Sequence, residues 1–289
     1  MLYIKKRYEY LIVGASLAAA VSIFVAIVAL GIYVPFRMYG EYIIPLDNKV
    51  NTYIAVALLV AMLPASIVGF FNLRYKKAVE KNVPRFLRSL MDDVHSGMTL
   101  PRALEMASER DFGPITDETQ IALSKFILGK KFDDAMMEMG EKLQNPQARQ
   151  VATILNEANS SGGRVSEVLS TATDMYSQLN EYREDRRSKM KPYTYLIYMA
   201  VLIFLIITYI SLEQFLRPLS TASTTATPLL KQFLPISYYE SIFFWAANIE
   251  GLLGGLVGGK ISEGTVSGGL LHAAVLVAIC VVFFNIFVF

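Results

Sequence analysis

HSGMTLPRALEMA, residues His95–Ala107, is the first of three copies of a pattern that decides how the middle of this chain folds. The other copies are LGKKFDDAMMEMG at Leu128–Gly140 and SGGRVSEVLSTAT at Ser161–Thr173, and alignment on a shared glycine spaces them 32 and 33 residues apart. Each copy has a large apolar residue three positions after the glycine, as expected where a new helix begins. A glycine can take the left-handed conformation that ends a helix, so the pattern predicts three helix–glycine–helix turns. Taken alone, the pattern is equally typical of any helical hairpin.

Apolar residues recur at helical spacing between and beyond these glycines. In one segment Ala122, Leu123, Phe126 and Ile127 are predicted to share a face. The pattern predicts a bundle of six helices. The first is predicted to begin at Asn82–Pro84, and the other five include Leu100–Ser108, Ala122–Ile127, Phe132–Leu143, Val151–Ala158 and Val165–Leu179.

The composition indicates a membrane protein with a water-exposed middle. The chain is 54% hydrophobic and 18% charged, which is too apolar for an ordinary soluble domain. The charges are concentrated, since 19 of 27 Lys and Arg residues lie between Arg74 and Lys191. Five stretches approach or exceed the roughly 20 apolar residues that a bilayer requires. These stretches are Leu11–Phe36, Tyr53–Phe71, Tyr195–Phe215, Ile242–Val257 and Leu270–Phe289.

The predicted fold class is therefore all-α and polytopic, with about five transmembrane helices and a six-helix cytoplasmic bundle. We expect an N-terminal membrane region at 1–73 with two spans, a helical domain at 74–192, and a C-terminal membrane region at 193–289 with three spans. Basic residues cluster before the first span, after the second and before the third. The positive-inside rule then places the N-terminus and residues 74–192 in the cytoplasm and the C-terminus outside.

The segment Gly254–Lys260, GGLVGGK, fits part of the phosphate-loop motif. That motif requires Ser or Thr next, where this chain has Ile261, and a preceding strand, where this chain has an apolar span. Close helix packing in lipid is the better interpretation, because Gly251, Gly255 and Gly259 recur every four residues, as do Gly254 and Gly258.

Three polar residues fall within predicted spans: Asn248, Glu250 and Asn285. Ionisable groups at that depth are costly, so a functional role for Glu250 and a structural one, hydrogen-bonded to a neighbour such as Asn285, stay equally open. No catalytic constellation, metal-ligand set or cofactor motif is visible, and we predict a protein that is not an enzyme. A net charge of +2 without a concentrated basic surface argues against nucleic acid as a partner.

The residues that surround the repeats resemble a known family. Pro84-x-Phe86-Leu87 followed by Ser96–Leu104, the stretch Gly129–Ala135, and Asn156–Leu169 with one extra spacer residue match its three landmarks in order. This order is similar to the type II secretion system F-domain family, the membrane platform proteins of type II secretion systems, type IV pili, Tad pili and archaella. The segment Gly259–His272 looks most like the archaeal branch. Many such platforms carry two such domains, whereas this chain has one, and a homodimer would supply the second.

The resemblance implies a non-enzymatic scaffold in the plasma membrane that couples a hexameric secretion ATPase to the insertion of pilin or archaellin subunits. The candidate contacts for that ATPase are the basic residues at the repeat turns: Arg102, Lys130, Lys131 and Arg164. For each of them, ordinary solvated charge is at least as good an interpretation. A membrane transporter or channel is the alternative function, and it would require more polar residues along the spans than the three named above.

Overall fold

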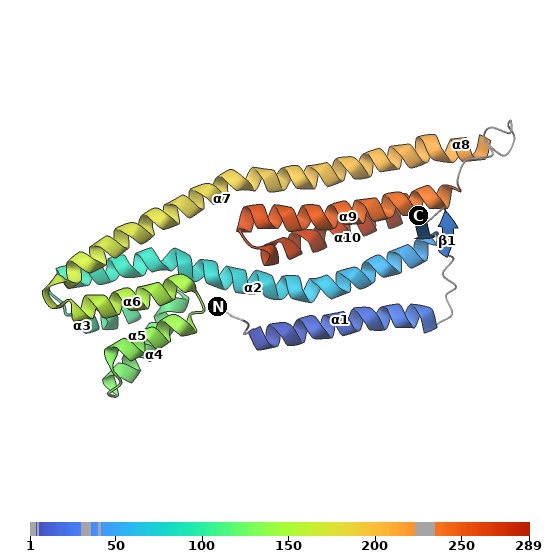
Figure 1. The fold of residues 1–289 in the computed structure, drawn as a ribbon. Helices are drawn as coiled ribbons and strands as arrows, with labels where there is room; N and C mark the ends of the chain where they lie inside the picture. Colours follow the sequence, from blue (N-terminus) through green and yellow to red (C-terminus); the bar gives the residue numbers. More distant parts are fainter. Residues whose placement is uncertain (1–3, 5, 30–35, 40–41, 223–234) are drawn as a thin grey trace. The chain divides into compact units, whose positions relative to one another are not determined.

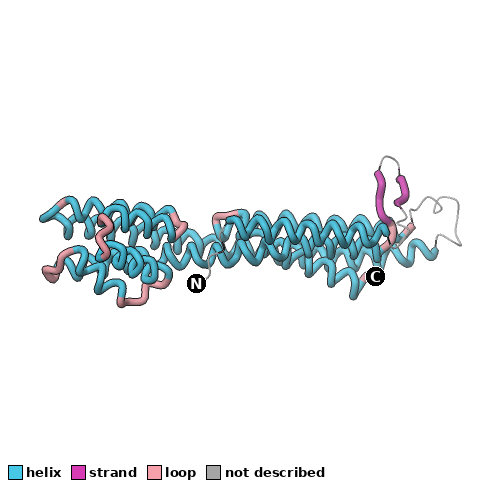
Figure 2. Tube along the Cα trace, turned by 90° about the horizontal axis from the view of Figure 1, so that it is seen from below, coloured by secondary structure: helices cyan, strands magenta, loops and turns pink. Residues whose placement is uncertain are grey.

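The computed structural model describes the chain except for residues 1–3, 5, 30–35, 40–41 and 223–234 (Figure 1). Within the described residues the chain is helical apart from two short strands, β1 (Phe36–Tyr39) and β2 (Tyr42–Pro45). The strands pair antiparallel, and their aromatic and β-branched residues favour that conformation (Figure 2). The expectation of an all-α chain holds for the rest of what is described.

Contacts divide the chain into two units, which are described separately below. One unit comprises residues 71–188, and the other comprises residues 4–70 together with 189–289. Two long helices, α2 (Asn48–His95) and α7 (Val165–Ile210), contribute residues to both units.

Residues 71–188, called the helical domain below, hold the end of α2, the start of α7 and the short helices between them. These are α3 (Leu100–Ser108), α4 (Pro114–Ile127), α5 (Phe132–Lys142), α6 (Pro146–Ser160) and a single 3₁₀ turn, η1 (Gly162–Arg164). The predicted helix at Leu100–Ser108 is confirmed. The predicted helix over Val151–Ala158 is confirmed as well, and it begins earlier, since the Asn145 side chain accepts a hydrogen bond from the Gln147 amide and caps α6.

The predicted helix start at Asn82–Pro84 is wrong, because α2 runs through this point without a break. A proline inside a helix removes one backbone hydrogen bond and costs about 3 kcal/mol. Here Val83, Phe86 and Leu87 are all buried on the domain side of α2, at 1% exposure or less. Burial of a large apolar side chain stabilises by about 1.5–3 kcal/mol, so the three together outweigh the proline.

The core of the helical domain is built from apolar side chains that every helix contributes. Phe86 packs edge-on against Phe112 with ring centroids 5.6 Å apart, and Phe126 packs in the same way against Phe132. Tyr176 is buried, and its hydroxyl donates to Gln150 at 3.0 Å. The side chains that are at most 2% exposed include Leu87, Leu90, Leu104, Met136, Leu143, Leu155 and Leu169.

The second unit contains the most apolar helices. It holds α1 (Lys6–Ala29), the apolar ends of α2 and α7, a π-helical turn η2 (Ser211–Leu216), α8 (Arg217–Ala222), α9 (Ile236–Glu263) and α10 (Val266–Phe287). Among the described residues, four helices are long and apolar enough to cross a membrane, namely those that contain Asn48–His95, Gly162–Ser220, Ile236–Glu263 and Val266–Phe287. The first predicted span, Leu11–Phe36, lies partly outside the described residues, and its described apolar part at Tyr10–Ile23 is shorter. A fifth span therefore stays a prediction.

Helices α9 and α10 form a tight antiparallel hairpin (Figure 1). Gly264 ends α9 in the left-handed conformation, with φ of 73°. Thr265 then caps α10 by accepting a hydrogen bond from the Gly268 amide. This glycine-then-threonine order ends one helix and starts the next within two residues.

Candidate functional site

The three repeat turns lie at one end of the helical domain, drawn at the left in Figure 1. His95, at the end of α2, lines the same open groove as Gly163 and Arg164 of the third turn. Near the second turn, the Asn156 side chain of α6 donates to the Asp133 carbonyl at the start of α5, at 3.1 Å. The alternation of helix direction in the domain thus brings the three copies of the repeated phrase to a common end.

The first two turns share one backbone structure. Gly97 and Gly129 have φ of 96° and 97°, a region that only glycine occupies without strain. The Gly97 amide donates to the Val94 carbonyl and the Met98 amide to the Asp93 carbonyl, at 3.0 and 3.2 Å. This pair of backbone hydrogen bonds is the Schellman cap, which satisfies carbonyl groups that the end of a helix would otherwise leave without a donor.

At the second turn the same pattern recurs. The Gly129 amide donates to the Phe126 carbonyl at 2.9 Å, and the Lys130 amide donates to the Lys125 carbonyl at 3.0 Å. The third turn differs, because Gly162 has φ of 63° and is followed by the 3₁₀ turn η1 rather than directly by an α-helix.

The four basic candidates lie in or just after these turns. Arg102 is paired with Glu105 at 2.5 Å, and its side chain is 59% exposed. Lys130 is paired with Glu138 at 2.6 Å. Lys131 and Arg164 are both exposed. A partner that binds this end would therefore compete with an existing ion pair at two of the four positions.

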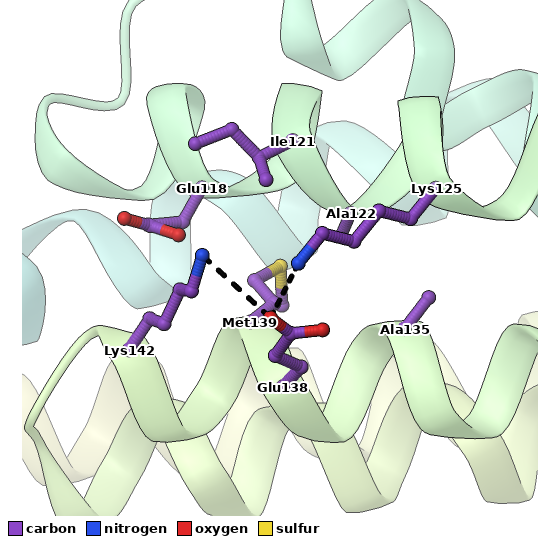
Figure 3. A pocket seen from close by; sticks show the side chains of 8 residues that line it. All are labelled: Glu118, Ile121, Ala122, Lys125, Ala135, Glu138, Met139 and Lys142. Carbon is purple, nitrogen blue, oxygen red and sulfur yellow. Dashed lines mark hydrogen bonds and ion pairs between the residues drawn. The ribbon is translucent and has the colours of Figure 1, made fainter. Parts of the chain in front are cut away.

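A cluster of lysines surrounds Glu138 in a shallow groove between α4 and α5 (Figure 3). Lys125 reaches across from α4 and hydrogen-bonds to Glu138, while Lys130 and Lys142 approach it at 2.6 and 3.6 Å. The hydrogen bonds from Lys125 and Lys130 lower the pKa of Glu138 from 4.5 to about 2. This carboxylate therefore stays ionised under all physiological conditions and bridges the two helices.

Sequence reasoning misplaced one residue of this region. Ile127 was expected to share the buried face of α4 with Leu123, but it is 75% exposed, and the adjacent Leu128 is 87% exposed. Helix α4 ends at Ile127, and the chain turns at Gly129 before another helix can cover it. Periodicity identifies a helical face but not the point at which the neighbouring helix ends.

The three polar residues of the apolar helices have different surroundings. Asn248 is buried, and its side-chain nitrogen donates to the Phe244 carbonyl at 2.8 Å, while its side-chain oxygen has no partner among the described residues. Asn285 donates to the Val281 carbonyl and accepts from Thr52. Glu250 is partly exposed, and no hydrogen bond joins it to Asn285 in the described structure.

The glycines of α9 face two different helices. A Cβ added at Gly255 would lie 2.2 Å from the Ala273 Cα of α10, and one at Gly259 would lie 2.0 Å from the Gly269 Cα. At Gly251 the nearest atom, in Leu276, would be 3.3 Å away.

Gly254 and Gly258 instead approach α7. Added Cβ atoms there would lie 3.0 and 3.1 Å from the Ile197 side chain. The segment Gly254–Lys260 is thus part of a continuous helix between two others, rather than the loop after a strand that phosphate binding requires.

A polar cluster in the second unit was not foreseen from the sequence. Arg217, just after the π-helical turn, donates to Glu240 at 3.1 Å and to the Val288 carbonyl at 2.6 Å. Glu240 is buried and also accepts from Asn48. The cluster joins α8, the start of α9, the end of α10 and the start of α2, and it satisfies a buried carboxylate that would otherwise be costly.

No group of three or more His, Cys, Asp or Glu side chains that could hold a metal ion occurs among the described residues.

Comparison with known proteins points to a single family. Residues 86–212 match the family described as Type II secretion system (T2SS), protein F. An uncharacterized protein of Methanocaldococcus jannaschii is 21% identical over 82% of this chain and 38% of its own length. The Flagella accessory protein J of the same archaeon is 28% identical over 36% of this chain and 19% of its own length. The chain thus spans well under half the length of these relatives.

No solved structure gave a significant match to this chain. The family match begins in α2 within the helical domain and ends in the π-helical turn that follows α7. It therefore covers the three repeat turns together with one apolar helix. Residues 86–212 of this membrane protein thus match the type II secretion system protein F family.

Proposed function

We propose that this chain is a non-catalytic platform protein of an archaellum-like or type IV pilus-like machine in the plasma membrane. The observation that carries the proposal is the family match over residues 86–212, which includes most of the helical domain and the apolar part of α7. One relative is named for an accessory role in flagella, which favours a filament-assembly machine among the systems that this family serves.

The proposed topology follows the charges. The N-terminus and residues 74–192, as a six-helix bundle, lie in the cytoplasm, about five helices span the membrane, and the C-terminus lies outside. In this arrangement the helical domain faces the compartment that holds ATP and ATPases.

The proposed mechanism is mechanical coupling. Helices α2 and α7 each run without a break from the helical domain into an apolar segment. Movement imposed on the domain by a hexameric secretion ATPase would be transmitted along these two helices to the membrane segments, where pilin or archaellin subunits are inserted. A homodimer would supply the second domain that longer platforms carry within one chain.

The proposed contact for the ATPase is the turn end of the helical domain, where Arg102, Lys130, Lys131 and Arg164 lie. Its test is co-purification of the full chain in detergent with a secretion ATPase. Reversal of all four charges to glutamate should abolish co-purification, because it replaces four attractive contacts with repulsive ones.

The matched control reverses four exposed basic residues elsewhere in the domain, Lys81, Arg85, Arg88 and Arg149, and changes the net charge equally. Binding that survives the first set, or that both sets abolish to the same degree, would contradict a contact at the turn end.

A further inference from the structure

The most exposed apolar pair of the helical domain lies at the turn between α4 and α5, which is called the hairpin tip below. The tip comprises Ile127, Leu128, Gly129, Lys130 and Lys131. Leu128 is 87% exposed and Ile127 is 75% exposed, which exceeds every other large apolar side chain described in residues 71–188. Two neighbouring apolar side chains held in water are unfavourable unless a partner covers them.

The fold does not require apolar residues at these two positions. The turn at Gly97 has the same Schellman cap, and there the two residues before the glycine are His95 and Ser96. At the third turn the same positions hold Ser160 and Ser161. Polar residues therefore occupy these two positions at both of the other turns. The turn itself does not account for the apolar side chains of Ile127 and Leu128.

The exposed pair lies in an ordered, hydrogen-bonded turn rather than in an irregular loop. Its backbone is fixed by the two cap hydrogen bonds at Gly129 and Lys130. The rings of Phe126 and Phe132 meet edge-on at 5.6 Å directly beneath it. One cap hydrogen bond joins the Lys130 amide to the Lys125 carbonyl. The side chains of the same two lysines both form ion pairs with Glu138. A turn whose backbone is already ordered loses little backbone entropy on binding, which is how a preorganised contact gains affinity.

The charges around the tip favour a protein over a lipid surface. Three lysines share the single carboxylate of Glu138, and Lys131 adds a fourth positive charge. Asp133 and Asp134, in the first turn of α5, lie beside them. Attachment to an anionic bilayer depends on clustered basic residues, and these two carboxylates reduce the net positive charge beside the tip. A protein pocket can match both signs, with carboxylates placed opposite the lysines.

We propose that the hairpin tip is a docking knob, in which Ile127 and Leu128 insert into an apolar pocket of the cytoplasmic ATPase and the lysines pair with carboxylates at the rim of that pocket. This inference rests on the proposed function and adds to it the residues that carry most of the affinity. The apolar pair is the centre of the contact because buried apolar anchors dominate interface energetics, whereas charges at a solvated rim contribute mainly to association rate and specificity.

The test transfers the residues of the first turn onto the second. In the full chain, reconstituted in neutral nanodiscs, Ile127→His is combined with Leu128→Ser, which copies His95 and Ser96. Affinity for the ATPase is measured by biolayer interferometry, and hydrogen exchange at Leu123 and Met136 checks that the domain core is intact. We expect binding to weaken at least tenfold, while Ser160→Ala with Ser161→Ala leaves it within twofold.

The outcomes separate this inference from the proposed function. If the wild-type chain fails to bind the ATPase at all, the proposed function fails. If the wild type binds and the double substitution at the tip binds within twofold of it, the docking knob is overturned and the platform role stands. If the double substitution spares ATPase binding but abolishes association with phosphatidylglycerol vesicles or with a second copy of the chain, the occupant is lipid or the chain itself, and the inference is likewise overturned.

Discussion

The glycines of the first two repeat turns and those inside helix α9 serve different purposes. At Gly97 and Gly129 the backbone has φ near 96°, and an added Cβ would meet no atom within 4 Å. At Gly255 and Gly259 the backbone is helical, and an added Cβ would lie within about 2 Å of backbone atoms of α10. Gly97 and Gly129 thus serve a backbone conformation, as Gly264 does at the end of α9, whereas Gly255 and Gly259 serve a close helix contact, as Gly140 does where an added Cβ would lie 2.9 Å from the Arg149 Cα of α6.

The difference reflects the two solvents. In water, burial of side chains such as Phe86 and Leu104 drives helices together, and the glycines at the repeat turns only need to end them. In lipid, apolar side chains gain little by leaving the solvent, so close backbone approach and van der Waals contact must hold the helices together. The same residue type therefore predicts different consequences on mutation in the two units.

The largest expected effect is a clash in the hairpin. Gly255→Ala places a methyl group 2.2 Å from the Ala273 Cα, so α9 and α10 must separate. Overpacking typically costs about 1–3 kcal/mol, and we expect about 3 kcal/mol here because backbone, rather than a movable side chain, stands in the way. The measurement is the free energy of unfolding by steric trapping in bicelles.

The neighbouring Gly254→Ala is the matched control for that experiment. It meets a side-chain methyl group, Cγ2 of Ile197, at 3.0 Å rather than backbone at 2.2 Å, and we expect a smaller cost of about 1 kcal/mol. Equal losses at Gly254 and Gly255 would show that helix propensity or expression, not the contact with α10, determines the effect.

A smaller effect is expected from strain at a domain turn. Gly129→Ala has room for its methyl group but must hold an alanine at positive φ, which costs roughly 1–2 kcal/mol. Hydrogen exchange of the α4 and α5 amides in the full chain measures this loss. Gly163→Ala, which is also in open space but lacks a positive φ, should change protection by less than about 0.5 kcal/mol. Similar losses at both positions would remove the conformational explanation.

Both glycine roles could be predicted from spacing, since a period near 32 residues marked the turns and a period of four marked the packed faces. The continuous course of α2 through Pro84 could not, because it depends on how much apolar surface the finished domain buries there. The exposure of Ile127 and Leu128 was hidden for a similar reason, since only the structure shows where α5 and its neighbours end.

The Arg217 cluster lay furthest beyond sequence reasoning. Arg217 lies 23 residues before Glu240 along the chain, and Asn48 lies 192 residues before Glu240. No periodic pattern links three helix ends, and each residue by itself is typical of a solvated loop. Such clusters follow from tertiary structure alone.

The smallest expected effect is electrostatic and concerns the groove at the hairpin tip. With a pKa of about 2 in the folded chain against 4.5 ordinarily, Glu138 binds a proton less readily when folded, so it contributes stability above pH 4.5 that is lost as the pH falls through 2. Carboxyl-carbon NMR should follow this titration directly. Lys125→Met should raise the pKa of Glu138 more than Lys142→Met does, because Lys125 donates a direct hydrogen bond and Lys142 stands 3.6 Å away. A pKa near 4.5 in the unsubstituted chain would show that the lysines are solvated rather than paired.

The central claim is that the repeat turns form the working end of a platform domain, and site-specific photo-crosslinking tests it most directly. A photoreactive residue at position 131, in the hairpin tip, should crosslink the full chain to the secretion ATPase. The same residue at position 149, in the first turn of α6 and at the opposite end of the domain, should not. Crosslinks to the ATPase from position 149 but not from position 131 would contradict the account.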